Sequence, residues 1–135
     1  MGAPGNLILL IEDDSANLLL TRTVLEEAGH RVLVASTVGA ARELLGVERP
    51  DLVLTDLALP DESGLELARE MTEDPRTAGI PVVCLTAHAM PGTETEVFEA
   101  GCADYLTKPI DIRELVRRVD ANLRLAGGAE DPGAA

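Results

Sequence analysis

The sequence predicts one α/β domain, built as a doubly wound five-stranded parallel sheet with five helices distributed over both faces. Short apolar runs alternate five times with helical patterns of roughly ten to fifteen residues, which is typical of parallel sheets. The runs LILLI and LVLT are continuously apolar, as expected for strands buried on both faces. The length of 135 residues suits a single domain.

The first half of the chain supplies two strands and two helices. The strand Leu7–Ile11 precedes a helix with its apolar face over Leu18–Ala28. That helix ends at Gly29, a residue type favoured just past a helix C-terminus. The strand Arg31–Ala35 then leads into a helix over about Val38–Val47.

The second half repeats the pattern three times. The three expected strands are Leu52–Thr55, Pro81–Thr86 and Ala103–Leu106. Helical spacing predicts a helix over about Ser63–Thr72, a weaker one around Val97–Ala100, and a last one from Ile112 to Leu123 with Asp111 as its N-cap.

The ends of the chain differ from its middle in composition. We expect residues 1–6 to be an N-terminal extension, residues 7–125 the folded domain, and residues 126–135, which are small and polar, a disordered tail. The start lacks the basic segment of a signal peptide, and its apolar run is too short to span a membrane. Two cysteines, Cys84 and Cys102, are expected to be free thiols without a metal or redox role, which favours a cytoplasmic location.

The charge balance limits the partners that the protein can bind. There are 24 acidic against 11 basic residues, a net charge of −13. Such a chain repels nucleic-acid phosphates and anionic lipid, so we expect neither nucleic acid nor a membrane as a partner. Phe98 and Tyr105 are the only aromatic residues, which leaves no platform for base stacking.

The residues at the ends of four expected strands, most of them polar, should meet at one edge of the sheet. They are Glu12, Asp13 and Asp14 after the first strand, Asp56 after the third, Thr86 and Ala87 after the fourth, and Thr107, Lys108 and Pro109 after the fifth. Carboxylates ~4 Å apart repel by about 4 kcal/mol at an effective dielectric of 20, so a cation or protonation is needed. An all-oxygen set suits Mg²⁺. Taken singly, Asp14 or Ser15 reads as a helix N-cap and Asp56 as a turn residue; together the residues indicate a functional site.

At these positions the sequence resembles the receiver domain of two-component response regulators, a flavodoxin-like fold. The matching segments are ILLIEDD, PDLVLTDLALPDESGLE, PVVCLTAHAM and GCADYLTKPID. The resemblance implies that Asp56 accepts a phosphoryl group from a phosphohistidine. It also implies that Glu12, Asp13, Asp56 and the backbone carbonyl of Ala58 hold Mg²⁺ or Mn²⁺, where the pair Glu12-Asp13 replaces the more usual two aspartates.

The resemblance implies further roles around the acceptor. Thr86, with Ala87 beside it, and Lys108 match the residues that contact the phosphoryl group, and Tyr105 matches the aromatic switch position. The peptide bond between Lys108 and Pro109 is expected to be cis. Ala58 and His88 occupy the two positions that tune the lifetime of the acyl phosphate. Because Ala58 cannot orient a water molecule, we expect slow dephosphorylation.

The resemblance implies a signalling switch rather than an enzyme. Its partners would be a histidine kinase or histidine phosphotransfer protein, and a downstream protein bound through the fourth helix, fifth strand and fifth helix. The natural-looking start and the small-residue tail favour a stand-alone regulator. A relay intermediate and a receiver excised from a hybrid kinase remain alternatives. A Mg²⁺-dependent aspartyl phosphohydrolase lacks its general acid, because Ala58 stands there, and an FMN-binding flavodoxin lacks its phosphate loop, because EDDSAN is acidic.

Overall fold

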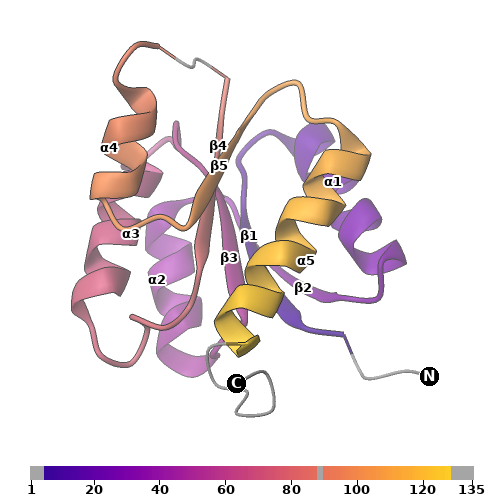
Figure 1. Ribbon diagram of the computed structural model, residues 1–135, viewed down its shortest axis with the longest axis horizontal. Helices are drawn as coiled ribbons and strands as arrows, with labels where there is room; N and C mark the ends of the chain where they lie inside the picture. The colour runs from indigo at the N-terminus through magenta and orange to yellow at the C-terminus, as the bar shows by residue number, and fades with distance from the viewer. Residues whose placement is uncertain (1–4, 88–89, 129–135) are drawn as a thin grey trace.

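The computed structural model of the chain describes residues 5–87 and 90–128, and within them strands and helices alternate (Figure 1). The elements are β1 (Leu7–Ile11), α1 (Ser15–Glu27), β2 (Arg31–Ala35), α2 (Val38–Val47), β3 (Leu52–Asp56), α3 (Gly64–Glu73), β4 (Val82–Thr86), α4 (Thr93–Glu99), β5 (Asp104–Thr107) and α5 (Ile112–Gly128). No helix in the described part of the chain is long and apolar enough to cross a membrane.

All five strands are parallel and lie in the order β2-β1-β3-β4-β5, which confirms the predicted fold class. The chain first winds outward from β1 to β2 and then returns to place β3 on the other side of β1. In such sheets, binding sites form beyond the carboxyl ends of the strands at this reversal. The reversal here lies between β1 and β3, where Ile11 is paired with Thr55.

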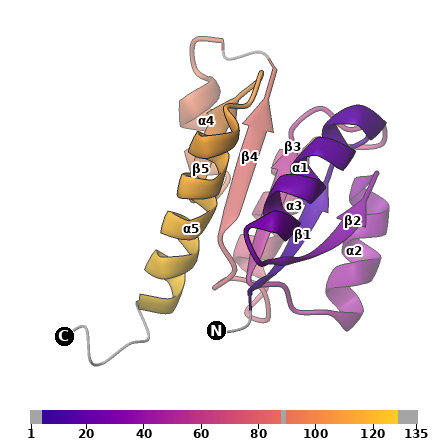
Figure 2. The ribbon, with the colours of Figure 1, turned by 90° about the vertical axis from the view of Figure 1, so that its right-hand side faces the viewer.

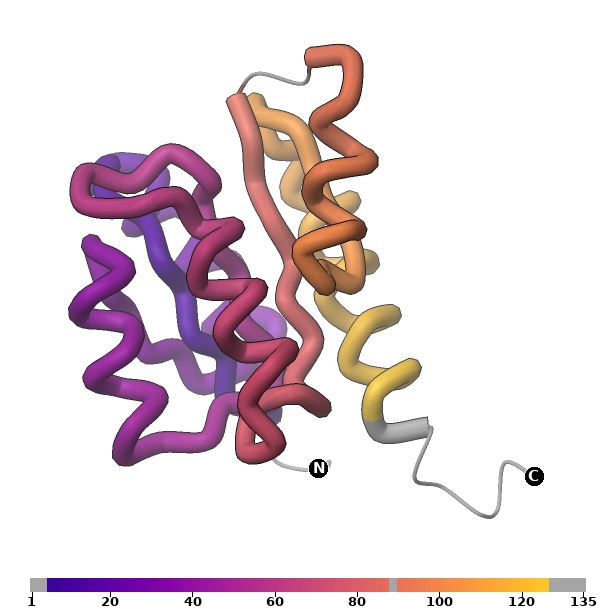
Figure 3. Tube along the Cα trace, turned by 90° about the vertical axis from the view of Figure 1, so that its left-hand side faces the viewer, coloured from indigo at the N-terminus to yellow at the C-terminus, as the bar shows by residue number. Residues whose placement is uncertain are grey.

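Alternate side chains of the strands enter two separate apolar cores. Leu9, Val53 and Cys84 face one core, which α2, α3 and α4 cover (Figure 3). Ile8 and Leu10 face the other core, which α1 and α5 cover (Figure 2). Because both faces are buried, the central strands are apolar at successive positions, and this explains the continuous runs in the sequence.

Most element boundaries agree with the predicted ones to within one residue, but α4 begins four residues earlier and α5 ends five residues later than expected. Strand β3 includes Asp56, whose backbone pairs with Leu85 of β4. Helix α3 starts at Gly64 because the Ser63 side chain accepts a hydrogen bond from a backbone N–H and acts as N-cap. Helix α5 extends to Gly128, past the expected domain end at residue 125, since Ala126 is a good helix former. The expected tail over 129–135 lies outside the described residues.

Candidate functional site

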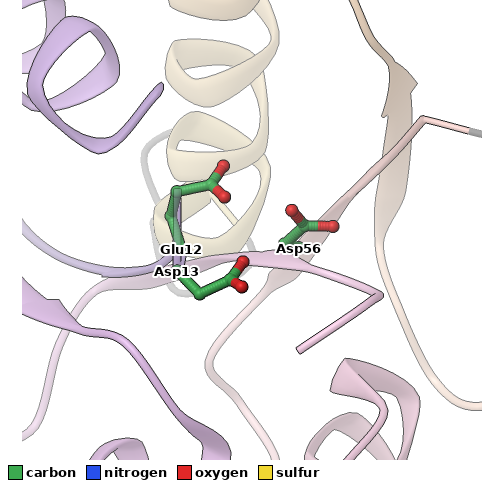
Figure 4. Close-up of side chains that lie close together, drawn as sticks. All are labelled: Glu12, Asp13 and Asp56. Carbon is green, nitrogen blue, oxygen red and sulfur yellow. The ribbon is translucent and has the colours of Figure 1, made fainter. Parts of the chain in front are cut away.

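Three carboxylates meet where β1 and β3 end. Glu12 and Asp13 directly follow β1, and Asp56 is the last residue of β3. Their side chains extend toward a common space (Figure 4), and one oxygen of each lies within 4.8 Å of the others. Glu12 and Asp56 are buried, with 1% and 6% of their surface exposed, whereas Asp13 is exposed. The site is therefore open to solvent on the side of Asp13.

Lys108 supplies the positive charge that faces this cluster. Its ammonium Nζ lies 2.6 Å from Oδ2 of Asp56 and 3.0 Å from Oε1 of Glu12. The residue follows β5, two strands away from β3, and its backbone N–H donates to the carbonyl of Thr86 at the end of β4 (2.8 Å). A single lysine thus ties together the carboxyl ends of four strands.

The surroundings of Glu12 and Lys108 shift the pKa values of both side chains. Burial raises the pKa of the Glu12 carboxyl, although the hydrogen bonds from Lys108 and from the backbone N–H of Asp14 act in the opposite direction. For Lys108, burial lowers the pKa, but the hydrogen bonds to Asp56 and Glu12 outweigh it and the net pKa is raised. Lys108 therefore stays charged at neutral pH, while Glu12 is a carboxylate that its surroundings only partly stabilise.

Backbone contacts hold Asp56 in place. Its Oδ1 accepts a hydrogen bond from the N–H of Ala58 (3.2 Å), and its carbonyl oxygen accepts one from the hydroxyl of Thr55 (2.9 Å). Gly64 packs directly against the same carbonyl: a Cβ atom there would lie 2.4 Å from the Asp56 oxygen. The role of Gly64 did not emerge from the sequence, where it lies in the first turn of the helix expected over about Ser63–Thr72.

The loop after Asp56 is anchored to α2 by contacts that the sequence did not reveal. Both carboxylate oxygens of Asp61 accept backbone N–H groups from the first turn of α2, those of Val38 and Gly39 (3.0 and 2.9 Å). These hydrogen bonds lower the pKa of Asp61. Arg42 of α2 forms ion pairs with Glu62 of the loop and Glu70 of α3. These contacts hold the loop that contains Ala58 and its backbone carbonyl in place against α2.

The remaining predicted residues surround the cluster at different depths. Thr86 is buried at the end of β4, and Ala87 follows it on the surface. Tyr105 is half-buried in β5, and its ring meets the ring of Phe98 from α4 edge-on at 6.1 Å. The Lys108–Pro109 peptide bond is cis. His88 lies outside the described residues.

The donor set fits a hard divalent cation. Among the described residues, the only cluster with metal-ligand spacing consists of the Glu12, Asp13 and Asp56 carboxylates, without histidine or cysteine. Three carboxylates against one ammonium leave excess negative charge, and oxygen ligands of this kind suit Mg²⁺.

The structure thus combines a doubly wound parallel sheet with an acidic cluster and a lysine at the point where the strand order reverses, as the resemblance to receiver domains predicts. Residues 8–120 match the response regulator receiver domain family, and the chain belongs to it. It is therefore a receiver domain of the two-component response regulator type, which confirms the resemblance seen in the sequence motifs.

Individual relatives differ in overall length. The chain is 38% identical over 123 residues to the phosphate regulon transcriptional regulatory protein PhoB of Pseudomonas aeruginosa, covering 91% of this chain but only 54% of PhoB. It is 33% identical over 116 residues to the polar-differentiation response regulator DivK of Brucella anthropi, covering 86% of this chain and 94% of DivK. The similarity thus extends to relatives of two kinds, one about twice as long and one of similar length.

Solved structures show the same fold. A CheY-like receiver domain protein from Methanospirillum hungatei superposes with a TM-score of 0.86 at 28% identity, covering 93% of this chain and 98% of that one. The receiver domain of sensor histidine kinase PA1611 from Pseudomonas aeruginosa has a TM-score of 0.81 at 31% identity, covering 88% and 98%. That structure contains a magnesium ion coordinated in its active-site cleft.

Proposed function

We propose that the protein is a phosphorylation-controlled switch in which Asp56 accepts a phosphoryl group from a phosphohistidine of a sensor kinase or phosphotransfer protein. The arrangement of Asp56 carries this proposal. Its carboxylate ends the strand next to the sheet reversal, faces two further carboxylates, and contacts the only lysine of the chain at 2.6 Å. Lysine ammonium groups can follow a phosphoryl oxygen as it moves, because the charge sits on a long flexible stem.

The chemistry is an in-line transfer between two proteins. A carboxylate oxygen of Asp56 attacks phosphorus, the P–N bond to the donor histidine breaks, and the product is an acyl phosphate. Lys108 and the hydroxyl of Thr86 then contact the new phosphoryl oxygens. Glu12, Asp13, Asp56 and the carbonyl of Ala58 would hold Mg²⁺ or Mn²⁺, which would supply charge neutralisation during the transfer.

We propose that the switch acts through the contacts of Lys108. In the unphosphorylated protein its ammonium is engaged by two carboxylates, and its backbone N–H holds the end of β5 against β4. A phosphoryl group on Asp56 competes for that ammonium and for Thr86. Tyr105 lies on β5 beside Phe98 of α4, so a shift of Thr86 is passed to the face formed by α4, β5 and α5, where a downstream protein binds.

The direct test is the intact mass of the protein after incubation with acetyl phosphate, with and without Mg²⁺. We expect one added phosphoryl group that requires the metal. Asp56→Asn abolishes the adduct, whereas Asp51→Asn, which changes the aspartate just before the same strand, retains it. Asp51 accepts only the N–H of Leu7, and an asparagine oxygen can do the same. An adduct that survives in Asp56→Asn, or that needs no metal, would refute the assignment.

The lifetime of the acyl phosphate is a separate part of the proposal. Ala58 presents only a methyl group next to Asp56 and cannot orient a hydrolytic water molecule. The second tuning position is His88. We expect the isolated phosphorylated protein to keep its phosphoryl group for minutes or longer. Complete loss within seconds would show that the protein itself catalyses hydrolysis, as an aspartyl phosphohydrolase does.

A further part of the proposal is whether the protein acts as a stand-alone regulator or as one step of a phosphorelay. We propose a stand-alone cytoplasmic regulator, supported by the similarity to DivK, 94% of which this chain covers, and by the two free thiols, which are typical of a reducing compartment. The two alternatives, a relay intermediate and a receiver excised from a hybrid kinase, are supported by the similarity to receiver domains of histidine kinases. Transfer of label from phosphorylated protein to a histidine phosphotransfer domain within seconds would favour the relay, and stable label would favour the stand-alone regulator.

A further inference from the structure

The two cysteines of the chain are brought together inside the domain. Cys84 lies in the middle of β4 and Cys102 in the turn between α4 and β5, and their sulfur atoms are 2.8 Å apart. Both are free thiols and both are buried, with Cys84 fully covered and Cys102 5% exposed. A disulfide bond has a length of about 2.05 Å, so the sulfur atoms need to move by less than one ångström to bond.

The backbone around Cys102 fixes this approach. The N–H of Cys102 donates to the carbonyl of Val97 in α4 (3.2 Å), and the N–H of Ala103 donates to the carbonyl of Val82 in β4 (2.8 Å). Gly101, with a φ of 98°, forms the turn and packs against Thr72 of α3. Main-chain hydrogen bonds on both sides of Cys102 therefore hold its backbone beside β4, within reach of Cys84.

The two thiols differ in acidity. The pKa of Cys102 is lowered, because its sulfur accepts the hydrogen bond from Cys84 and because the charge of Arg69 lies nearby, although burial acts in the opposite direction. The pKa of Cys84 is raised by its hydrogen bond to Cys102 and by burial. Thiolates react with peroxides and thiols do so far less, so Cys102 is the more reactive of the two.

We propose that Cys84 and Cys102 are a modification site that forms an intramolecular disulfide when the protein meets a hydroperoxide. The Cys102 thiolate attacks one oxygen of hydrogen peroxide, the O–O bond breaks, and the other oxygen leaves as hydroxide, which takes up the thiol proton of Cys102 to become water. A sulfenic acid remains on Cys102. The sulfur of Cys84 then attacks the sulfenic sulfur, the S–O bond breaks, and the oxygen leaves as water with the thiol proton of Cys84. In total the two thiols lose two protons and two electrons, and one hydrogen peroxide molecule becomes two molecules of water.

The disulfide would join β4 to the turn between α4 and β5, close to the proposed switch residues Thr86 and Tyr105. Cys84 is two residues before Thr86, and Cys102 is three residues before Tyr105 on the edge strand β5. Closing the disulfide fixes the start of β5 and the end of α4 against β4. In this part the inference rests on the proposed function: oxidation holds the α4–β5 face in one arrangement while Asp56 stays chemically intact.

The test starts with native protein and a titration with hydrogen peroxide. We expect a mass loss of two hydrogen atoms, loss of both alkylatable thiols, a peptide that links Cys84 to Cys102, and recovery with dithiothreitol. Linked dimers, sulfinic acid on either cysteine, or thiols that stay alkylatable at all peroxide concentrations would overturn the proposal. None of these readouts depends on phosphorylation, so a failure here leaves the proposed function standing, and a failure of phosphorylation leaves the disulfide standing.

Matched variants test the order of the steps. In Cys84→Ser, and in Cys84→Ala as a second version in case serine disturbs the strand, the sulfenic acid on Cys102 has no resolving thiol and should be trapped by dimedone. In Cys102→Ser, trapping at Cys84 should be at least about tenfold slower, since its thiol is buried and rarely ionised. Equal trapping rates in the two single variants would refute the assignment of Cys102 as the attacking residue.

Discussion

Replacing Lys108 by methionine should destabilise the metal-free protein by about 3 kcal/mol near pH 7. The substitution removes the ammonium but keeps a side chain of similar length. In the unmodified protein this ammonium contacts two carboxylates, and the side chains of Lys108, Asp56 and Glu12 are only 15%, 9% and 1% exposed. Without it, the buried carboxylates repel one another with no protein cation between them.

The magnitude follows from the geometry. At an effective dielectric of 20, charges 2.6 and 3.0 Å apart attract by about 6 and 5.5 kcal/mol, and carboxylates no more than 4.8 Å apart repel by at least about 3.5 kcal/mol. Much of the attraction is offset by desolvation of the ammonium. Removing one partner of a buried pair typically costs about 3–5 kcal/mol, and the partial exposure of Lys108 places the expected value at the lower end.

The assay is urea denaturation followed by circular dichroism, in chelator, near pH 7 and near pH 5. The hydrogen bond and the charge of Lys108 lower the pKa of Glu12, so the loss of the ammonium raises the pKa of Glu12 further in the folded state. A group with a raised folded pKa binds protons more tightly in the folded state, and falling pH therefore stabilises the fold. The deficit of Lys108→Met should shrink toward pH 5. Arg22→Met, which breaks an exposed pair with Glu26, should cost less than about 1 kcal/mol at either pH. A deficit of that small size for Lys108→Met, unchanged with pH, would refute the electrostatic reasoning.

Three further substitutions probe other parts of the site. Gly64→Ala should destabilise the fold by about 1–3 kcal/mol and slow phosphorylation, because its Cβ would lie 2.4 Å from the carbonyl of Asp56; urea midpoints and acetyl phosphate kinetics measure both effects. Asp61→Ala should lower the melting temperature by uncapping α2, and since the folded pKa of Asp61 is depressed, the difference from the unmodified protein should disappear as the pH falls below 3.8. Glu12→Gln should weaken Mg²⁺ binding by at least about tenfold in calorimetry. Because burial raises the pKa of Glu12, the same variant should also lose the gain in stability that the metal-free protein shows on acidification from neutral pH toward 4.5.

The sequence was sufficient for the fold and for the meeting of Glu12, Asp13, Asp56 and Lys108. The reason is that parallel strands align all their carboxyl ends, so a residue that follows a buried strand is placed without knowledge of side-chain packing. The apolar runs located the strands to within one residue. The end of α5 was set five residues short, at Leu123, because the small residues after Leu125 read as a tail, although Ala126 favours helix.

Contacts between distant loops could not be predicted in the same way. Asp61 accepts the N–H groups of Val38 and Gly39 in the first turn of α2, although it lies 23 and 22 residues after them in the sequence. No local sequence pattern marks a helix cap supplied from so far away. The Cys84 and Cys102 thiols meet because of the offset between β4 and the turn before β5, which depends on strand register. Register and loop path are properties of the folded chain, and a single sequence gives no direct measure of either.

The excess negative charge of the carboxylate cluster makes the site sensitive to any change in charge at Asp56. Three carboxylates against one ammonium leave an excess of two negative charges, which equals the charge of one divalent cation with the opposite sign. The proposed metal binding and phosphorylation would therefore both change the electrostatic free energy of a cluster that the protein itself balances only in part. Lys108 contacts two carboxylates of this cluster, and its backbone N–H donates to the carbonyl of Thr86 at the end of β4. A change in the charge at Asp56 is for this reason also a change in the forces on the β4–β5 edge, where Tyr105 and the cysteine pair lie.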